Sequence, residues 1–392
     1  MSDAQTADAA MGPCKGLRVI DLTSVLAGPF CGRLLADLGA EVIKVESPGS
    51  DLSRLIGPSL HGVAAGFEQF NHGKKSLSVN LKDPNDLAAV RALIEGADIF
   101  LHNSRPGVME RLGLGWETLQ ALNPRLVYGV ISGFGEDGPY AGRPAYDGLV
   151  QGLTGFMHVQ GGEDGPAAIL TSLVDKITSV FGANALLAAI IHRDRTGEGQ
   201  KVVVSLLSAY TAFVCYDMMM GYVFKDLGFQ NIQPPAVPTY RLLDTADGKV
   251  IGLVLQQKQF EGFCAALERT DLLDDPRFAT APLRSANLGL LYDEVRPQTT
   301  KLSTAALLAL MVKHDAPFAP INTIEQFFED PQVKHIQGYL DFDDPEFGTI
   351  RHLNHPASFE KTPLNMARRA PKLGEHNSEI LARVAAVKPK QQ

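Results

Sequence analysis

The stretch Leu17-Arg-Val-Ile-Asp-Leu-Thr-Ser-Val-Leu-Ala-Gly-Pro-Phe-Cys-Gly-Arg-Leu-Leu-Ala-Asp-Leu-Gly-Ala-Glu-Val-Ile-Lys-Val-Glu46 decides the fold. It predicts a strand over 17–22, a turn at 27–29, a helix over 30–38 and a second strand over 40–46 that is rich in β-branched residues. Strand, helix and strand in this order form a βαβ unit, which implies a parallel sheet with a right-handed crossover. The predicted fold class is therefore α/β, and ligands are expected at the carboxyl ends of the strands.

The same alternation continues along the chain. A third strand is predicted within residues 71–80, and a helix follows that starts near Pro84 and ends before Gly96, the usual places of proline and glycine at helix ends. The sequence then predicts a strand over 97–102, helices over 108–112 and 116–122, and strands over 125–132 and 201–205. Repeated units of this kind indicate a doubly wound, Rossmann-like domain.

A Gly-x-Gly-x-x-Gly pattern follows one of these strands, as Gly133-Phe-Gly-Glu-Asp-Gly138. Such a motif binds a dinucleotide only where it opens a helix whose N–H groups meet the pyrophosphate. Here Pro139 follows at once, and the acidic pair Glu136 and Asp137 would repel phosphates. We therefore predict that this segment is not a dinucleotide site.

One acidic side chain, Asp175, stands just before a helix of apolar and small residues that extends to about His192. Apolar residues recur near the helical period from Ile177 to Ile191, and small residues cover much of the rest, so we expect burial on nearly all sides. Free N–H groups and the helix dipole would keep the Asp175 carboxylate ionised in a dry cleft, where it could act as a nucleophile. On this segment alone, the preferred interpretation is a simple helix cap.

The composition is that of an ordinary globular protein of two or three domains, with 392 residues, 45% hydrophobic and 20% charged. The net charge of −8 and the pI near 5.7 argue against a nucleic-acid-binding surface. Four scattered cysteines show neither metal-ligand spacing nor a disulfide pattern, so we predict no metal site and a reducing, cytoplasmic environment. The start of the chain lacks the order of a signal peptide, and uninterrupted apolar runs are too short for a membrane span.

The domain organisation is predicted from a change of texture near residue 223. Residues 1–222 form the first part of the large Rossmann-like domain, and residues 223–335 form a Pro-rich linker and a smaller α+β domain. The linker prolines are Pro234, Pro235 and Pro238, and a hairpin turns at Asp247-Gly248. Residues 336–392 are predicted to return and complete the large domain.

Several motifs together resemble the class III CoA-transferase family, also called CaiB/BaiF. They are 17–29, Gly39–Glu46, Asn103–Gly107, Asn123–Arg125, Ser132–Gly135 with Gly138-Pro139, Arg193–Gln200, Ala370-Pro371 and Gly374–His376. They follow the family's order from about Gly16 to Ala382. The resemblance implies a Rossmann-like large domain made from both chain ends, a smaller inserted domain, and a homodimer of two interlocked, ring-like protomers.

The resemblance also implies a reaction, the movement of CoA from an acyl-CoA thioester to a free carboxylic acid. The family's nucleophile is an Asp at the start of the helix before an Arg-x-x-Thr-Gly-x-Gly-Gln connection, and that position is Asp175 here. Its carboxylate would form a mixed anhydride and then an aspartyl-CoA thioester. Backbone N–H groups near Leu26-Ala27 and from the smaller domain would stabilise the oxyanions. No cofactor and no metal is expected, because CoA enters as part of the substrate.

The family places the acyl group near Tyr146, Asp147 and Leu26. The related racemases have a His at the position of Tyr146, so racemisation is disfavoured here. A tyrosine packed against the core is the alternative for Tyr146. Members that resemble formyl-CoA transferases have Gln at the position of Leu26, so an oxalate-type transferase is disfavoured. Gln256 and Gln257 replace a Gly-rich loop of many relatives and are either contacts for the acceptor carboxylate or plain surface residues.

The residues expected to contact CoA follow from the same resemblance, and basic side chains among them suit its phosphates. They are Val25, Ala27, Ser47, Lys74, Lys75, Asn103, Arg105, Arg111 and Arg143. For each basic residue taken singly, a solvated surface position is the alternative. The alternatives for the whole protein are an acyl-CoA racemase or isomerase of the same fold, and a non-catalytic CoA-binding subunit. The acyl donor and the acceptor acid are not predicted, and neither nucleic acid nor membrane is expected as a partner.

Overall fold

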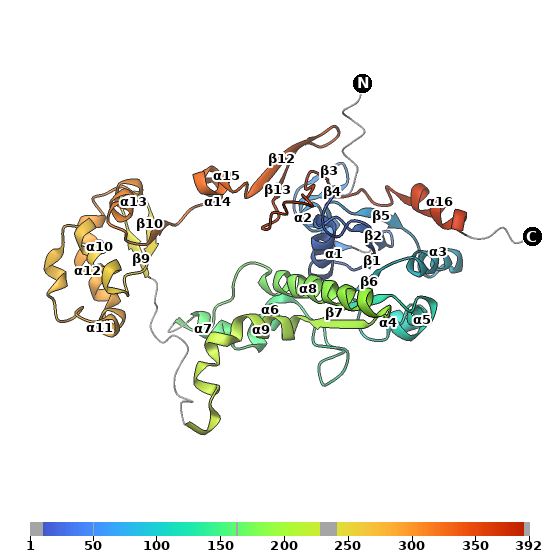
Figure 1. Ribbon diagram of the computed structural model, residues 1–392, viewed down its shortest axis with the longest axis horizontal. Coiled ribbons are helices and arrows are strands. Elements are labelled where there is room, and N and C mark those ends of the chain that lie inside the picture. The colour runs from blue at the N-terminus through green and yellow to red at the C-terminus, as the bar shows by residue number, and fades with distance from the viewer. Residues whose placement is uncertain (1–10, 50, 162–163, 228–240, 388–392) are drawn as a thin grey trace, which may run out of the picture. The chain divides into compact units, whose positions relative to one another are not determined.

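The structure is a computed structural model that describes residues 11–49, 51–161, 164–227 and 241–387 (Figure 1). The chain divides into two compact units, residues 1–216 with 336–392 and residues 217–335. The first unit thus contains residues from both ends of the chain. The predicted linker prolines, Pro234, Pro235 and Pro238, lie outside the described residues.

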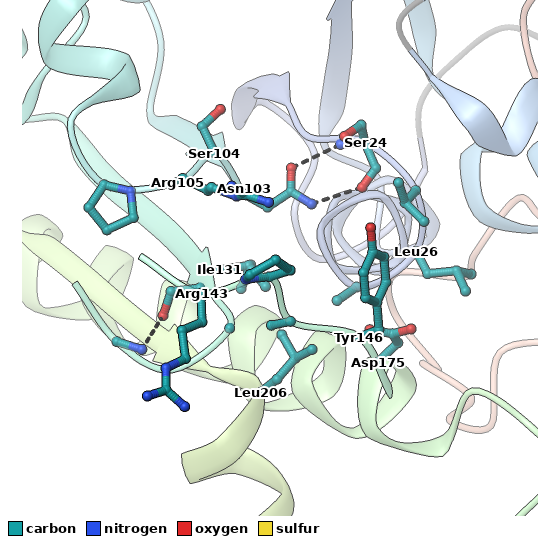
Figure 2. A pocket seen from close by; sticks show the side chains of 18 of the residues that line it. Ser24, Leu26, Asn103, Ser104, Arg105, Ile131, Arg143, Tyr146, Asp175 and Leu206 are labelled. Atoms are coloured by element: carbon teal, nitrogen blue, oxygen red, sulfur yellow. Dashed lines mark hydrogen bonds between the residues drawn. The ribbon is translucent and has the colours of Figure 1, made fainter. Parts of the chain in front are cut away.

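The first unit is built on a six-stranded sheet with the order β5-β2-β1-β6-β7-β8, in which every neighbouring pair is parallel. The strands are β1 (Arg18–Leu22), β2 (Glu41–Glu46), β5 (Lys75–Ser78), β6 (Ile99–His102), β7 (Val127–Ser132) and β8 (Lys201–Ser205). Counted along the chain, this is the 3-2-1-4-5-6 order of Rossmann folds, whose strand order reverses between the first and fourth strands. The predicted α/β class with a parallel sheet is confirmed. A cavity lies at the reversal, where β1 and β6 end (Figure 2).

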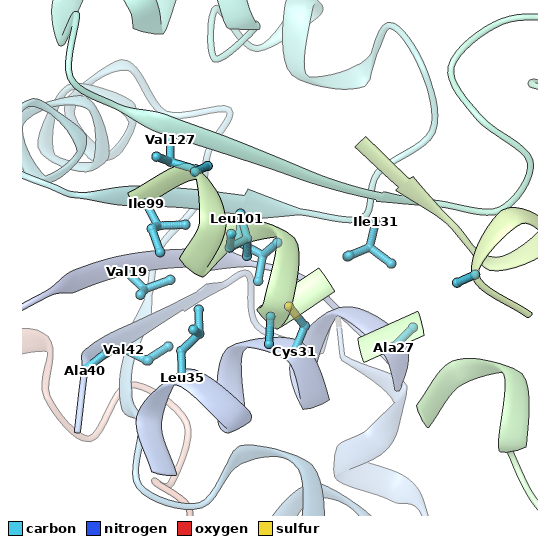
Figure 3. Close-up of a cluster of buried hydrophobic side chains, with 14 of the residues drawn as sticks. Val19, Ala27, Cys31, Leu35, Ala40, Val42, Ile99, Leu101, Val127 and Ile131 are labelled. Carbon is cyan, nitrogen blue, oxygen red and sulfur yellow. The ribbon is translucent and has the colours of Figure 1, made fainter. Parts of the chain in front are cut away.

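Helices cover both faces of this sheet because its strands bury alternate side chains on opposite sides. Val19 of β1 belongs to the core cluster that includes Leu35 of α1 (Ala27–Asp37) and Leu186 of α8 (Leu173–Thr196), part of which Figure 3 shows. Its neighbour Ile20 belongs to the opposite cluster. That cluster includes residues of α3 (Pro84–Glu95), α5 (Trp116–Leu122) and α16 (Asn377–Val387). The C-terminal segment therefore completes one face of the sheet.

Helix α8 is long and apolar enough to cross a membrane by length and composition, but half of its most apolar window is buried within the protein. It lies close to β7 and α1, since a Cβ on Gly182 would meet the Ile131 side chain at 2.9 Å and Cys31 Sγ at 3.0 Å. The expectation that this helix is buried on nearly all sides is wrong. Val180 is 56% exposed and Ile191 is 52% exposed, because no other described element covers that side of the helix.

The second unit is a small α+β structure with its own core. Its three-stranded sheet has the order β11-β10-β9 and is antiparallel. The strands are β9 (Arg241–Asp244), β10 (Lys249–Gly252) and β11 (Phe318–Pro320), and the longer helices are α10 (Gln257–Ala266), α12 (Leu288–Thr299) and α13 (Thr304–Lys313). The hairpin predicted at Asp247-Gly248 is the β9–β10 turn.

Three further segments of the first unit contain short elements. Residues 51–72 contain η1 (Leu52–Leu55), the hairpin of β3 (Ser59–Leu60) and β4 (Val63–Ala64), and α2 (Ala65–Asn71). Two short helices, α6 (Asp147–Leu153) and α7 (Phe156–Gly161), separate at Gly155, which has a φ of 76°. In the C-terminal segment, β13 (Gly348–Leu353) pairs with β12 (Tyr339–Asp344).

Candidate active site

The cavity at the strand-order reversal has a volume of about 310 Å³. It is lined by the loop after β1 (residues 24–27), the loop after β6 (residues 103–106) and the end of β7 with its following loop, together with Asp175 and Leu206. Asn103 joins the first two loops, because its Oδ1 accepts from Ser24 N at 3.0 Å and its Nδ2 donates to Ser24 O at 2.8 Å (Figure 2). The cavity therefore occupies the place where ligands bind in open parallel sheets.

Asp175 lies at the third residue of α8, and Ser172 occupies the N-cap position without a side-chain hydrogen bond. The Asp175 carboxylate accepts no hydrogen bond from the part of the chain that the structure describes, so the helix-cap interpretation is wrong. Its backbone N–H donates to Asp147 Oδ2 at 3.2 Å. Ser179, one turn further along α8, has its Oγ 2.7 Å from both Asp175 O and Ala27 O, and its single hydroxyl hydrogen is shared between these two acceptors. The first turns of α1 and α8 are thereby joined at the cavity.

The first turn of α1 presents unused backbone donors to the same cavity. Its N-cap residue, Leu26, makes no side-chain cap, and among the described residues the N–H groups of Leu26, Ala27 and Gly28 have no acceptor. The preceding residue, Val25, has a φ of 72°, which is an outlier for a β-branched residue. Donors at a helix N-terminus are suited to bind negative charge that develops on an oxygen.

Burial and, to a smaller extent, the like charge of Asp147 raise the pKa of Asp175, while Lys176 lowers it, and the net result is a pKa of about 7. The expectation that the helix terminus keeps this carboxylate fully ionised is therefore corrected. The helix N–H groups do not bond to the carboxylate, so they do not outweigh its loss of water. Near neutral pH the unliganded site holds Asp175 in both protonation states.

We predict a pH profile that depends on the Asp147–Asp175 pair. Because only the ionised carboxylate is nucleophilic, kcat/KM should rise with pH through about 7 and then level off. Asp147→Asn removes the neighbouring negative charge and should move this limb to lower pH, whereas Lys176→Gln removes the neighbouring positive charge and should move it to higher pH. Rates measured across the pH range for the three proteins test this. An unchanged limb in both variants would show that another group titrates.

Eight of the residues predicted for the site line this cavity. They are Val25, Leu26, Ala27, Asn103, Arg105, Arg143, Tyr146 and Asp175. Asp147 lies beside it, in the first turn of α6, where it bonds to Asp175 N and Gln151 Nε2. Tyr146 is 66% exposed, so the alternative of a tyrosine packed against the core is wrong. Figure 2 shows its ring beside Asp175.

Two predicted phosphate ligands are engaged within the protein. Lys74 is fully buried, and its Nζ bonds to Asp21 Oδ2 at 2.8 Å, Pro29 O at 2.7 Å and Asn71 Oδ1 at 2.9 Å. An ammonium has three donors, so none is left for a ligand, and the prediction for Lys74 is corrected. Lys75 is the first residue of β5, and its Nζ bonds to Glu379 at 2.6 Å, away from the cavity.

Ser47 and Arg111 of the first unit are not among the residues that line the cavity. Ser47 follows β2, and Arg111 is the exposed last residue of α4 (Val108–Arg111). Gln256 and Gln257 belong to the second unit. Gln256 forms a capping box with Gln259 at the start of α10, and the Gln257 amide bonds to Glu261 and Arg284. The Gly133–Gly138 pattern lies in the loop after β7, and no helix opens in this described loop before α6. That the pattern binds no dinucleotide stays a prediction.

Sequence reasoning missed the residues that hold the site together. Ser179 could have been found, since it lies four residues after Asp175 and thus on the same side of the helix. Ser24 lies two residues after the end of the first strand and could have been placed at the strand-order reversal. Lys44 and Asp51 could not, because their buried ion pair joins two elements whose packing only the structure shows.

Comparisons with known proteins agree with this geometry. The sequence profile of CoA-transferase family III matches residues 14–377. The chain is 37% identical to the succinate–glutarate CoA-transferase of Agrobacterium fabrum over 387 residues, covering 96% of both chains. It is 35% identical to the succinyl-CoA:mesaconate CoA-transferase of Haloarcula marismortui over 386 residues, covering 95% of this chain and 96% of that chain. The crystal structure of a CaiB/BaiF family protein from Brucella suis superposes with a TM-score of 0.85 at 34% identity, covering 95% of this chain and all of that chain. The chain therefore belongs to CoA-transferase family III and is an enzyme that moves CoA between an acyl-CoA thioester and a carboxylic acid.

Proposed function

We propose that this enzyme transfers CoA through a covalent aspartyl-CoA thioester on Asp175. The observation that carries the proposal is a largely buried carboxylate at a cavity that is also lined by the N-terminus of α1. Within the described part of the chain, this carboxylate has no hydrogen-bond donor and the first N–H groups of α1 have no acceptor. A carboxylate held in this way is poorly solvated and is therefore a more reactive nucleophile than one in water.

The reaction proceeds by four exchanges of acyl group. The ionised Asp175 carboxylate attacks the thioester carbonyl and expels CoA thiolate, which leaves a mixed anhydride. The thiolate attacks the aspartyl carbonyl and releases the donor acid. The acceptor carboxylate then attacks the aspartyl-CoA thioester and expels the thiolate again. Finally the thiolate attacks the acceptor's acyl carbonyl, so that the new thioester leaves and Asp175 is free.

Each tetrahedral intermediate carries its charge on the former carbonyl oxygen. The N–H groups of Ala27 and Gly28 are the donors that we assign to this oxygen, since they line or adjoin the cavity and have no acceptor of their own. The exchange conserves one activated acyl group throughout, so the proposed mechanism requires no nucleotide, metal or other cofactor.

We infer that the acyl groups are short dicarboxylates. The two relatives are named for succinate, glutarate and mesaconate, which carry a second carboxylate. Arg105 and Arg143 line the cavity, and each could pair with that carboxylate or with a phosphate of CoA. We expect the second carboxylate of the bound acid to form an ion pair with one of these arginines.

A matched set of acids tests this proposal. With succinyl-CoA as donor, glutarate and mesaconate should give a kcat/KM at least about tenfold higher than butyrate or valerate. The reason is that a monoacid has no second carboxylate and leaves the arginine that would pair with it without a partner. The measurement is the initial rate of new thioester formation by chromatography. Equal rates with the monoacids would rule out dicarboxylate selectivity. Absence of deuterium exchange at the α-carbon would separate transfer from racemisation.

We further propose that the enzyme is a homodimer, as the interlocked assembly of the family implies. The exposed side of α8 and the neighbouring α9 (Leu206–Met218) form an apolar face. Its most exposed members are Val180, Ile191, Phe213 and Tyr216, and all are at least half exposed. Exposed apolar patches of this kind mark protein interfaces. Sedimentation velocity should give a dimer mass, and a monomer at micromolar concentration would contradict the assignment.

A further inference from the structure

The loop between β1 and α1 holds a strained residue next to the proposed oxyanion donors. Val25 has a φ of 72°, and a β-branched side chain in the left-handed region costs roughly 1–3 kcal/mol. Such a conformation persists only where the surrounding structure enforces it. Leu26, the next residue, begins the run of unused N–H groups at α1. The backbone at Val25 therefore sets the direction in which those groups point.

A buried ion pair enforces this conformation. Asp51 accepts from Val25 N with Oδ1 at 3.2 Å and pairs with Lys44 Nζ through Oδ2 at 2.7 Å. Lys44 Nζ also donates to Thr23 O at 2.8 Å, so the pair holds the loop on both sides of Ser24. The side chains of Lys44 and Asp51 are 0% and 2% exposed.

The pair does not belong to the cavity itself. Neither residue lines it, and both oxygens of Asp51 are directed to groups of the protein. Although burial acts to raise it, the pKa of Asp51 is lowered, because Lys44 and Ser53 favour its ionised form. A buried ion pair gives little net stability compared with apolar packing. Besides the contacts of Asp51 with Ser53, the pair bonds to the backbone of the β1–α1 loop at Thr23 and Val25.

We propose that Lys44 and Asp51 are positioning residues for catalysis, which hold Val25 in the left-handed conformation and thereby aim the Leu26–Gly28 N–H groups into the cavity. The inference rests on the proposed function, because it takes these N–H groups as the oxyanion donors. Lys44 and Asp51 touch no reacting atom and act only through the loop.

Asp51→Asn is the direct test, and Asp98→Asn is its matched control. Asp98 likewise accepts from a backbone N–H, that of Arg18 at 2.7 Å, and pairs with a buried cation, Arg193, at 2.6 Å, but away from the cavity. Asparagine has one acceptor where aspartate has two, so each variant leaves one donor unserved. Compared at equal folded fraction, Asp51→Asn should lower kcat about tenfold more than Asp98→Asn, with little change in KM. Equal losses would overturn the proposal.

A double-mutant cycle separates positioning from general destabilisation. Glycine adopts positive φ without strain, so Val25→Gly should no longer need the ion pair. Adding Asp51→Asn to Val25→Gly should therefore lower kcat by less than about threefold. A loss this small would show that the effects of the two substitutions are coupled. Adding it to Val25→Ala, which keeps the Cβ and the strain, should still cost about tenfold. Additive losses in the Val25→Gly background would overturn the proposal.

Ser53→Ala tests the same positioning role if the Asp51→Asn variant does not fold. Ser53 is buried, and its N and Oγ donate to Asp51 Oδ1 at 2.9 and 2.7 Å, so its hydroxyl helps to fix the carboxylate. Loss of the hydroxyl should lower kcat about threefold in the natural background and not in Val25→Gly. The same kcat as wild type, or the same loss in both backgrounds, would overturn the proposal.

Formation of the aspartyl-CoA adduct distinguishes a failure of the proposed function from a failure of the positioning role of Lys44 and Asp51. Wild-type enzyme that turns over without an adduct on Asp175 would overturn the proposed function. Wild-type enzyme that forms the adduct, with the Asp51→Asn variant forming it equally fast, would overturn only the positioning role of Lys44 and Asp51.

Discussion

Asp175→Asn is expected to lower CoA transfer by about 10⁴-fold or more, the largest effect of any single substitution considered. The amide has nearly the shape of the carboxylate but cannot form an anhydride. The side chains that we expect to contact the nucleotide part of CoA do not include Asp175, so acyl-CoA should still bind with a similar Kd. Initial rates and calorimetric titration with acyl-CoA measure the two effects separately.

Thermal unfolding of the Asp175→Asn variant tests whether its loss of activity comes from unfolding. The pKa of Asp175 lies near 7 in the folded protein, above its ordinary value, so the ionised carboxylate destabilises the fold at higher pH. The cost is absent below the unfolded pKa and complete above the folded one. Asp175→Asn should therefore raise Tm at about pH 8 and leave it unchanged at about pH 4. A variant with near wild-type activity would contradict the nucleophile assignment.

Gly28→Ala is expected to lower kcat by about 10²-fold, because it displaces the proposed oxyanion donors. A Cβ at Gly28 would lie 2.4 Å from Thr23 Cβ, a distance at which one of the two segments must move. Thr23 cannot yield easily, since its N–H and hydroxyl both donate to the buried Asp21. The first turn of α1 must therefore shift, which displaces its N–H groups. The rate of adduct formation on Asp175 should fall in parallel with kcat.

Gly142→Ala is the control for this substitution. Gly142 lies in the loop that leads to Tyr146, and a Cβ there meets no described atom within 4 Å. The variant should retain activity within about threefold of wild type, as expected of an exposed surface site. Overpacking at Gly28 also costs stability, roughly 1–3 kcal/mol, so rates must be compared at equal folded fraction. An unimpaired Gly28→Ala enzyme would exclude the α1 terminus from catalysis.

Local patterns were sufficient to predict the framework of the first unit. The alternation from Leu17 to Glu46 predicted β1, α1 and β2 within a few residues, because strand and helix periodicity and the Gly39 stop are properties of the chain itself. The prediction of a cavity at the strand ends followed from parallel topology alone. Asp175 was placed at the first turn of its helix, where the structure has it.

Long-range contacts could not be predicted. The family resemblance predicts that Lys74 contacts a phosphate of CoA, yet its buried partners Asp21 and Asn71 come from other elements. The protonation of Asp175 depends on Asp147, which lies 28 residues earlier in the sequence. The exposed side of α8 was expected to be buried because its apolar residues do not reveal whether the covering surface belongs to the same chain.

The central claim is that CoA becomes covalently attached to Asp175 during turnover. The most direct measurement is mass spectrometry of the peptide that contains Asp175, after the enzyme is mixed with acyl-CoA in the absence of acceptor and quenched in acid. The account predicts a mass increase equal to CoA minus water on that peptide, which disappears when acceptor acid is added and is absent in Asp175→Asn. Full turnover with an unmodified Asp175 peptide, or an adduct on another residue, would contradict it.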